Sequence, residues 1–74
     1  MSVAEARMLE ATHRWLRDSH GRPIRVAIAK IGREHNLNGR QTRRALHRLA
    51  ELDLLDLEDC GGEVVLAPTE EKGG

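Results

Sequence analysis

The stretch from Leu37 to Leu55, LNGRQTRRALHRLAELDLL, constrains the fold more than any other part of the chain. Its apolar residues recur at helical spacing and share one face of the predicted helix. The residues on that face are Thr42, Ala45, Leu46 and Leu49. Asn38 is a suitable N-cap, and the Gln41 amide stands where it closes a capping box. The pattern therefore predicts a capped amphipathic helix that packs one face into a core.

The opposite face of this helix is rich in arginine. It carries five basic or potentially basic residues against one acid, Glu51. Arginine pairs with guanine O6 and N7 or with phosphate, and Gln or Asn pairs with adenine, so such a face suits a major groove. A charged helix face is often simply solvated, but the excess of bases favours a polyanion. The candidate DNA-binding residues are Asn38, Arg40, Gln41, Arg43, Arg44, His47 and Arg48.

The formal charge of the chain is zero, but it is unevenly distributed. Residues 1–50 hold eleven Lys and Arg against four Asp and Glu, a balance of +7. Residues 51–74 hold one Lys against eight acids, a balance of −7. This asymmetry points to a polyanionic partner and to a separate acidic surface.

Two further helices are predicted before the arginine-rich one. Ser2 and Glu5 form an S-x-x-E capping box that opens the first helix, which ends near His20 at Gly21. Its apolar stripe consists of Met8, Leu9, Thr12, Trp15 and Leu16. A very short strand is expected at residues 24–25, and a second helix from Val26 to His35. Asn36 then tolerates a left-handed turn.

The hydrophobic period changes after the third helix. Leu55 and Leu57 alternate with acids, residues 59–62 (DCGG) indicate a turn, and residues 63–67 are β-rich. A two-stranded hairpin is therefore expected. The predicted fold is mainly α with a β-hairpin, in one domain over residues 1–67, followed by a disordered tail over residues 68–74.

The remaining residues indicate no catalytic or metal site. The four histidines are not spaced as metal ligands, and the lone Cys60 excludes an intramolecular disulfide. No nucleophile elbow, phosphate loop or paired-carboxylate site is found, so we expect a non-enzyme without a cofactor. With no long apolar run and no export signal, we expect no membrane contact and a cytoplasmic, nucleoid-associated protein.

The order helix, short strand, helix, tight turn, arginine-rich helix and hairpin resembles a winged helix-turn-helix domain. Residues 23–55 resemble the DNA-binding domains of the MarR-like, GntR-like and Lrp-like groups of small bacterial and archaeal regulators. The matching positions are Leu37, Asn38, Thr42, Ala45-Leu46, Leu49 and Leu54-Leu55. The resemblance implies a three-helix fold with a wing and a third helix that reads double-stranded DNA.

Two departures from that family bear on function. The family usually has Gly after its recognition helix, where the backbone makes a left-handed turn. This chain has Asp53 there, and we expect it to adopt that conformation at some energetic cost. Its members often grip DNA with a basic wing, whereas this hairpin has no basic residue. The hairpin instead carries the acids Asp56, Glu58, Asp59 and Glu63. Contact between this hairpin and DNA is therefore not expected. We expect its acids to face a protein or to pair with basic residues of a second subunit, such as Arg7, Arg14 or Arg17 on the first helix.

Three functions remain open on the sequence. The first is a sequence-specific DNA-binding protein that regulates transcription as a homodimer, because one helix without a basic wing offers few phosphate contacts. The second is a protein-interaction module in which the acidic hairpin is the interface and the arginine face binds an acidic partner. We expect a homodimer or a protein partner to bind through the acidic hairpin or the first helix. The third is an accessory DNA-binding factor of a phage or plasmid.

Overall fold

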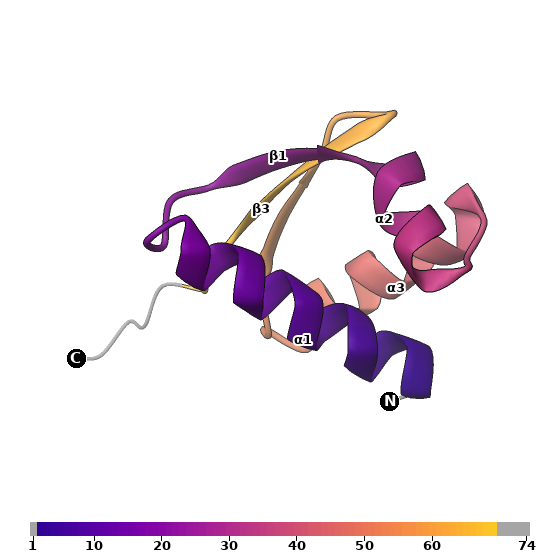
Figure 1. The fold of residues 1–74 in the computed structure, drawn as a ribbon, viewed down its shortest axis with the longest axis horizontal. Helices are drawn as coiled ribbons and strands as arrows, with labels where there is room; N and C mark the ends of the chain where they lie inside the picture. The colour runs from indigo at the N-terminus through magenta and orange to yellow at the C-terminus, as the bar shows by residue number, and fades with distance from the viewer. Residues whose placement is uncertain (1, 70–74) are drawn as a thin grey trace.

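The computed structural model describes residues 2–69, which form three helices and a three-stranded antiparallel sheet. In chain order these elements are α1 (Val3–Asp18), β1 (Ile24–Ala27), α2 (Ile28–His35), α3 (Gly39–Glu51), β2 (Asp56–Asp59) and β3 (Glu63–Ala67). Figure 1 shows α1 along one side of the molecule, with the sheet beside its C-terminal half. No helix within residues 2–69 is long and apolar enough to cross a lipid bilayer.

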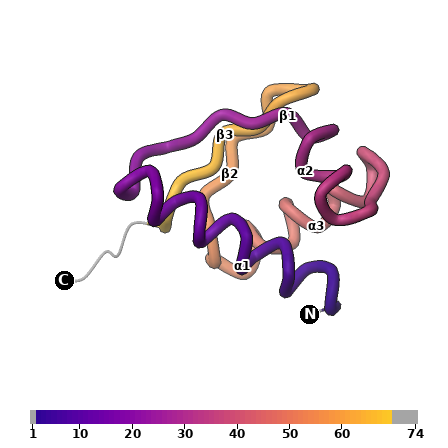
Figure 2. The backbone as a smooth tube through the Cα atoms, viewed as in Figure 1, coloured from indigo at the N-terminus to yellow at the C-terminus, as the bar shows by residue number. Residues whose placement is uncertain are grey.

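The sheet has the strand order β1-β3-β2, so the last strand is central. β1 pairs with β3 from Ile24 opposite Leu66 to Ala27 opposite Glu63. β2 pairs with the other edge of β3, where Asp59 lies opposite Val64. Residues 56–67 form the predicted hairpin, whose tip reaches the start of α2 (Figure 2). There the Ile28 N–H donates to the Gly62 carbonyl at 3.0 Å.

The first strand is longer than the sequence predicted, and the second helix is shorter. Val26 and Ala27 were expected to be helical, but they belong to β1 and pair with Val64 and Glu63. The helix begins only at Ile28, and its N-cap, Ala27, makes no side-chain hydrogen bond. Pairing with β3 satisfies the backbone of this segment, so tertiary contacts override its helical pattern. The fold therefore contains the three predicted helices and the predicted hairpin, and the expected short first strand extends the hairpin to a three-stranded sheet, which gives a mixed α and β fold.

Each of the three helices ends in a left-handed residue. His20, Asn36 and Asp53 have φ of 56°, 56° and 58°. The next residue donates its N–H to the carbonyl five positions back, in the pairs Gly21–Leu16, Leu37–Gly32 and Leu54–Leu49. This is the hydrogen bond of a Schellman ending, in which a left-handed residue satisfies the last helical carbonyls. The expected left-handed turns at Asn36 and Asp53 are confirmed.

One hydrophobic core joins all three helices to the sheet. Its buried members are Met8, Ile28, Ile31, Ala45, Leu46, Leu49, Leu55, Val64 and Leu66. Trp15 is partly buried and packs against this cluster. Thr42, Ala45, Leu46 and Leu49 are all buried, so the predicted apolar face of α3 is confirmed. Of the expected disordered tail, only Pro68 and Thr69 lie within the described residues.

Candidate nucleic-acid interface

The start of α3 is held by the predicted capping box. Asn38 Oδ1 accepts from the Gln41 N–H at 2.8 Å, and Gln41 Oε1 accepts from the Asn38 N–H at 2.9 Å. Both side-chain oxygens are therefore committed, while both NH₂ groups can still donate. A bidentate contact with adenine uses an amide oxygen and nitrogen together. Asn38 or Gln41 would have to leave the cap to make one.

Three arginines form an exposed stripe along α3. Arg40, Arg44 and Arg48 follow one another at intervals of four residues, which places them on one side of the helix. All three are exposed. Within residues 2–69 their guanidinium groups make no ion pair. We call these three residues the arginine stripe.

The arginine stripe borders two hollows of the surface. A groove of about 360 Å³ lies between the start of α1 and α3, and its lining includes Arg44 and Arg48. A hollow of about 520 Å³ lies between the starts of α2 and α3, and Arg40 and Arg43 line it beside Gly62 of the hairpin tip. The arginines that line these hollows all come from α3 and stand at concave parts of the surface, and Glu5 of α1 also lines the first groove.

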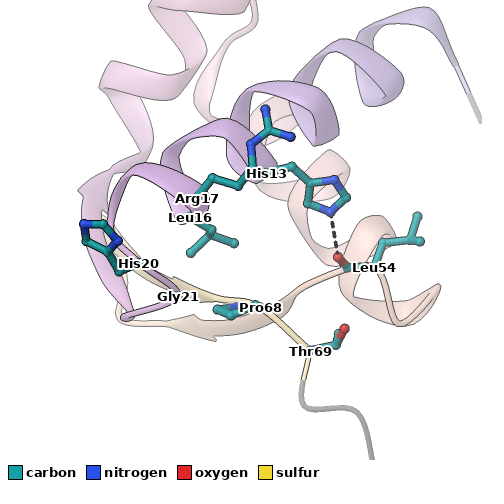
Figure 3. Close-up of a pocket in the computed structure, with 8 residues that line it drawn as sticks. All are labelled: His13, Leu16, Arg17, His20, Gly21, Leu54, Pro68 and Thr69. Atoms are coloured by element: carbon teal, nitrogen blue, oxygen red, sulfur yellow. Dashed lines mark hydrogen bonds between the residues drawn. The ribbon is translucent and has the colours of Figure 1, made fainter.

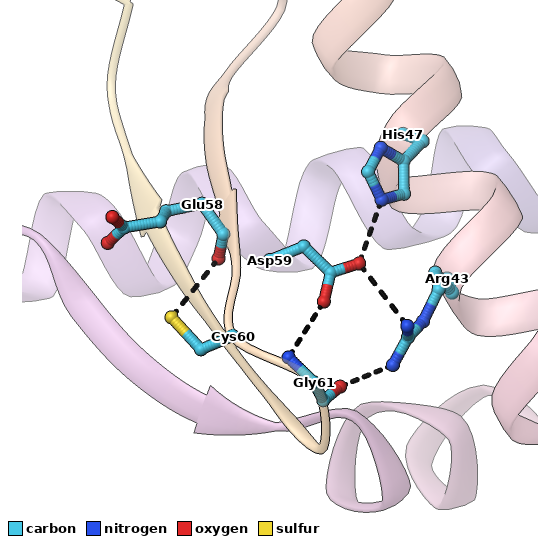
Figure 4. A network of polar contacts seen from close by, with 6 residues as sticks. All are labelled: Arg43, His47, Glu58, Asp59, Cys60 and Gly61. Carbon is cyan, nitrogen blue, oxygen red and sulfur yellow. Dashed lines mark hydrogen bonds and ion pairs between the residues drawn. The ribbon is translucent and has the colours of Figure 1, made fainter.

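Arg43 and His47, also predicted to bind DNA, are engaged by the hairpin (Figure 4). Asp59 Oδ2 accepts from His47 Nε2 at 2.9 Å and lies 3.4 Å from Arg43 Nη1. Asp59 Oδ1 accepts from the Gly61 N–H at 3.0 Å, and Arg43 Nη2 donates to the Gly61 carbonyl. The hydrogen bond from His47, followed by that from Gly61, lowers the pKa of Asp59 below its ordinary value. We call these contacts the Asp59 clamp.

The sequence did not predict the Asp59 clamp. The acids of the hairpin were expected to face a protein or to pair with a second subunit through Arg7, Arg14 or Arg17. Asp59 instead binds α3 of its own chain, and Glu63 lies 3.6 Å from Arg25 of β1. The only available indication was that the predicted hairpin follows α3 closely in the chain and carries Asp59 at its turn. The position of Asp59 along α3 depends on how the sheet packs against the helices.

A cavity near the end of the described chain lies between α1 and the segments that follow α3 and β3 (Figure 3). It has a volume of about 470 Å³, and its lining includes His13, Arg17 and His20. His13 Nε2 lies 3.2 Å from the Leu54 carbonyl, so this nitrogen is the donor. Within residues 2–69, no three His, Cys, Asp or Glu side chains come together as a metal site requires.

Comparison with known proteins identified no relative: no family model, curated protein or solved structure matches the chain. The function is therefore inferred from the geometry and charge of the surface around α3.

Proposed function

We propose that this chain is a winged helix-turn-helix protein that binds double-stranded DNA through α3 and regulates transcription. The observation that carries the proposal is the arginine stripe, Arg40, Arg44 and Arg48, which is exposed and free of ion pairs within residues 2–69. Its spacing of four residues matches a helix that presents one edge to a groove, and guanidinium groups suit guanine edges and phosphates.

The arrangement of the elements supports this proposal. α2 and α3 are joined by a turn at residues 36–38, and a hairpin follows α3, which is the order expected of a winged helix-turn-helix domain. α3 is anchored on its opposite face by buried residues, so its exposed face is held rigidly. A rigid helix loses little conformational freedom when it enters a groove.

The test is the affinity of the purified protein for a labelled random-sequence duplex, measured by fluorescence anisotropy. The variant Arg40→Ala/Arg44→Ala/Arg48→Ala should lose roughly 100-fold or more in affinity, because it removes three contacts with bases or phosphates together and each lost contact weakens binding. The matched control, Arg7→Ala/Arg17→Ala/Arg22→Ala, removes the same charge from exposed positions outside α3. The affinity of this control for the duplex should fall only about fivefold, because the removed charges act on DNA from a distance and are screened by salt.

Equal losses in the two variants would show that net charge alone drives binding and would overturn the assignment of α3. If the wild-type protein does not bind duplex DNA even at low salt, the proposal fails. The alternative of a protein-interaction module would then take its place. If DNA binds, sizing of the complex tests the expected homodimer, and in vitro selection identifies the preferred sequence.

A further inference from the structure

The Asp59 clamp places an anion on two of the residues expected to contact DNA. The carboxylate of Asp59 is bound by Arg43 and His47 of α3 and by the Gly61 amide of its own hairpin. Arg43 and His47 are one helical turn apart, so their side chains converge on a single point. A guanidinium, an imidazole N–H and a backbone N–H are also the donors that bind phosphate oxygens in protein–DNA complexes.

The clamp occupies the donors that a nucleic acid would need. Arg43 uses Nη1 for Asp59 and Nη2 for the Gly61 carbonyl, so both terminal nitrogens of its guanidinium are engaged. His47 uses Nε2 for Asp59. End-on bidentate binding of phosphate or guanine by Arg43 requires these same nitrogens. A phosphate at this position would also lie close to the Asp59 carboxylate, and the two like charges would repel.

We propose that Asp59 is an internal competitor for DNA phosphate, which withholds Arg43 and His47 from the duplex and so lowers its affinity. This inference rests on the proposed function. It assigns the first interactions with DNA to the arginine stripe and reserves Arg43 and His47 for a state in which the clamp has opened.

The clamp is built so that it can open. The Asp59 side chain retains 23% of its accessible surface, so water and ions reach it. The Arg43 and His47 side chains are 43% and 48% exposed. Rotation of these side chains can therefore open the clamp without disturbing the buried residues of β3. When the clamp opens, a DNA phosphate replaces the Asp59 carboxylate as the anion that Arg43 and His47 bind.

The experiment measures how the affinity for a random-sequence duplex depends on salt in the wild type, Asp59→Asn and Glu58→Gln. The substitution Asp59→Asn removes the charge but keeps a side-chain oxygen that can accept from the Gly61 amide. At about 50 mM salt this variant should bind about tenfold more tightly than wild type. The slope of log K against log salt should steepen by about 1 for each additional phosphate that is bound. Circular dichroism confirms that the variant is folded.

Glu58→Gln is the matched control, because it removes the same charge one residue away. The Glu58 side chain points away from the clamp in Figure 4. This control should raise the affinity by no more than about twofold, through long-range repulsion alone. In a background of Arg43→Ala/His47→Ala, Asp59→Asn should have no larger effect than Glu58→Gln, because the competing donors are absent.

Four outcomes decide the proposal. Tighter binding by Asp59→Asn that disappears in the Arg43→Ala/His47→Ala background supports it. If Asp59→Asn and Glu58→Gln raise the affinity for DNA equally, the effect is long-range repulsion alone. If Asp59→Asn binds DNA more weakly than wild type, Asp59 positions Arg43 and His47 for DNA. Either result overturns the clamp as a competitor while leaving the arginine stripe in place. Absence of duplex binding in every variant overturns both proposals.

Discussion

At the scale of single residues, Gly32 decides how closely two helices approach. It is a buried residue of α2, and a Cβ added there would lie 2.6 Å from the Leu37 carbonyl oxygen and 2.8 Å from Thr42 Oγ1. Both neighbouring groups are held in place by hydrogen bonds. The Leu37 N–H donates back to the Gly32 carbonyl, and the Thr42 hydroxyl donates to the Asn38 carbonyl at 2.8 Å. The tight turn between α2 and α3 therefore requires glycine.

We predict that Gly32→Ala destabilises the protein by about 1–3 kcal/mol, because overpacking outweighs the improvement in helix propensity. Urea unfolding monitored by circular dichroism measures the change. The control is Gly39→Ala at the first position of α3, where an added Cβ meets no atom within 4 Å. It should leave stability within about 1 kcal/mol of wild type. A Gly32→Ala protein as stable as wild type would show that the two helices can separate at little cost.

At the scale of elements, the Asp59 clamp is a polar link between α3 and the hairpin. The pKa of Asp59 is lowered in the folded protein by the hydrogen bond from His47, then by that from Gly61 and by the charge of Arg43. A carboxyl group whose pKa falls on folding stabilises the native state when it is ionised, at a pH above its unfolded pKa. That contribution is lost as the pH falls through the folded pKa.

We therefore predict that the difference in melting temperature between wild type and Asp59→Asn is fully present at neutral pH. It should shrink as the pH falls below about 4, where aspartate in an unfolded chain takes up its proton. Thermal melts across this range measure the difference. Glu58→Gln serves as the control, and its difference from wild type should stay small at neutral pH. If the melting temperatures of wild type and Asp59→Asn differ by the same amount from neutral pH to about pH 2, the clamp does not stabilise the ionised form of Asp59.

At the scale of the whole molecule, a single core holds the helices and the sheet together. Met8, Ile31, Leu46 and Leu66 come from α1, α2, α3 and β3, and each is fully buried. No element has a separate core of its own within residues 2–69. A small domain in which every element depends on one cluster is expected to unfold in a single cooperative step.

We predict that helix content and the environment of Trp15 are lost together on heating. Trp15 is the only aromatic residue of the chain, and it packs against the core from α1, so its fluorescence reports on that contact. Circular dichroism and tryptophan fluorescence should give the same midpoint within about one degree. An earlier transition in fluorescence would mean that α1 detaches before the rest of the fold is lost.

Local patterns in the sequence were sufficient to predict α1, α3 and the two faces of α3, and they predicted the presence of α2 but not its first residue. The capping boxes at Ser2 and Asn38, the left-handed turns at Asn36 and Asp53, and the burial of Leu46 and Leu49 were all predicted. These features depend on residues within about one or two helical turns of each other, so their spacing in the chain carries the information. The hairpin was predicted for the same reason, since its strands are joined by a short glycine turn.

The extent of β1 and the partners of the charged residues depend instead on long-range packing. Val26 and Ala27 became a strand because β3, far along the chain, offered an edge to pair with. Asp59 meets His47 across twelve positions, at a register that the packing of the sheet against the core sets. Long-range pairings leave no periodic pattern in the sequence, and charged side chains can reach several partners. Which arginines remain exposed on α3 and which are neutralised by the hairpin therefore emerged only when the chain was folded.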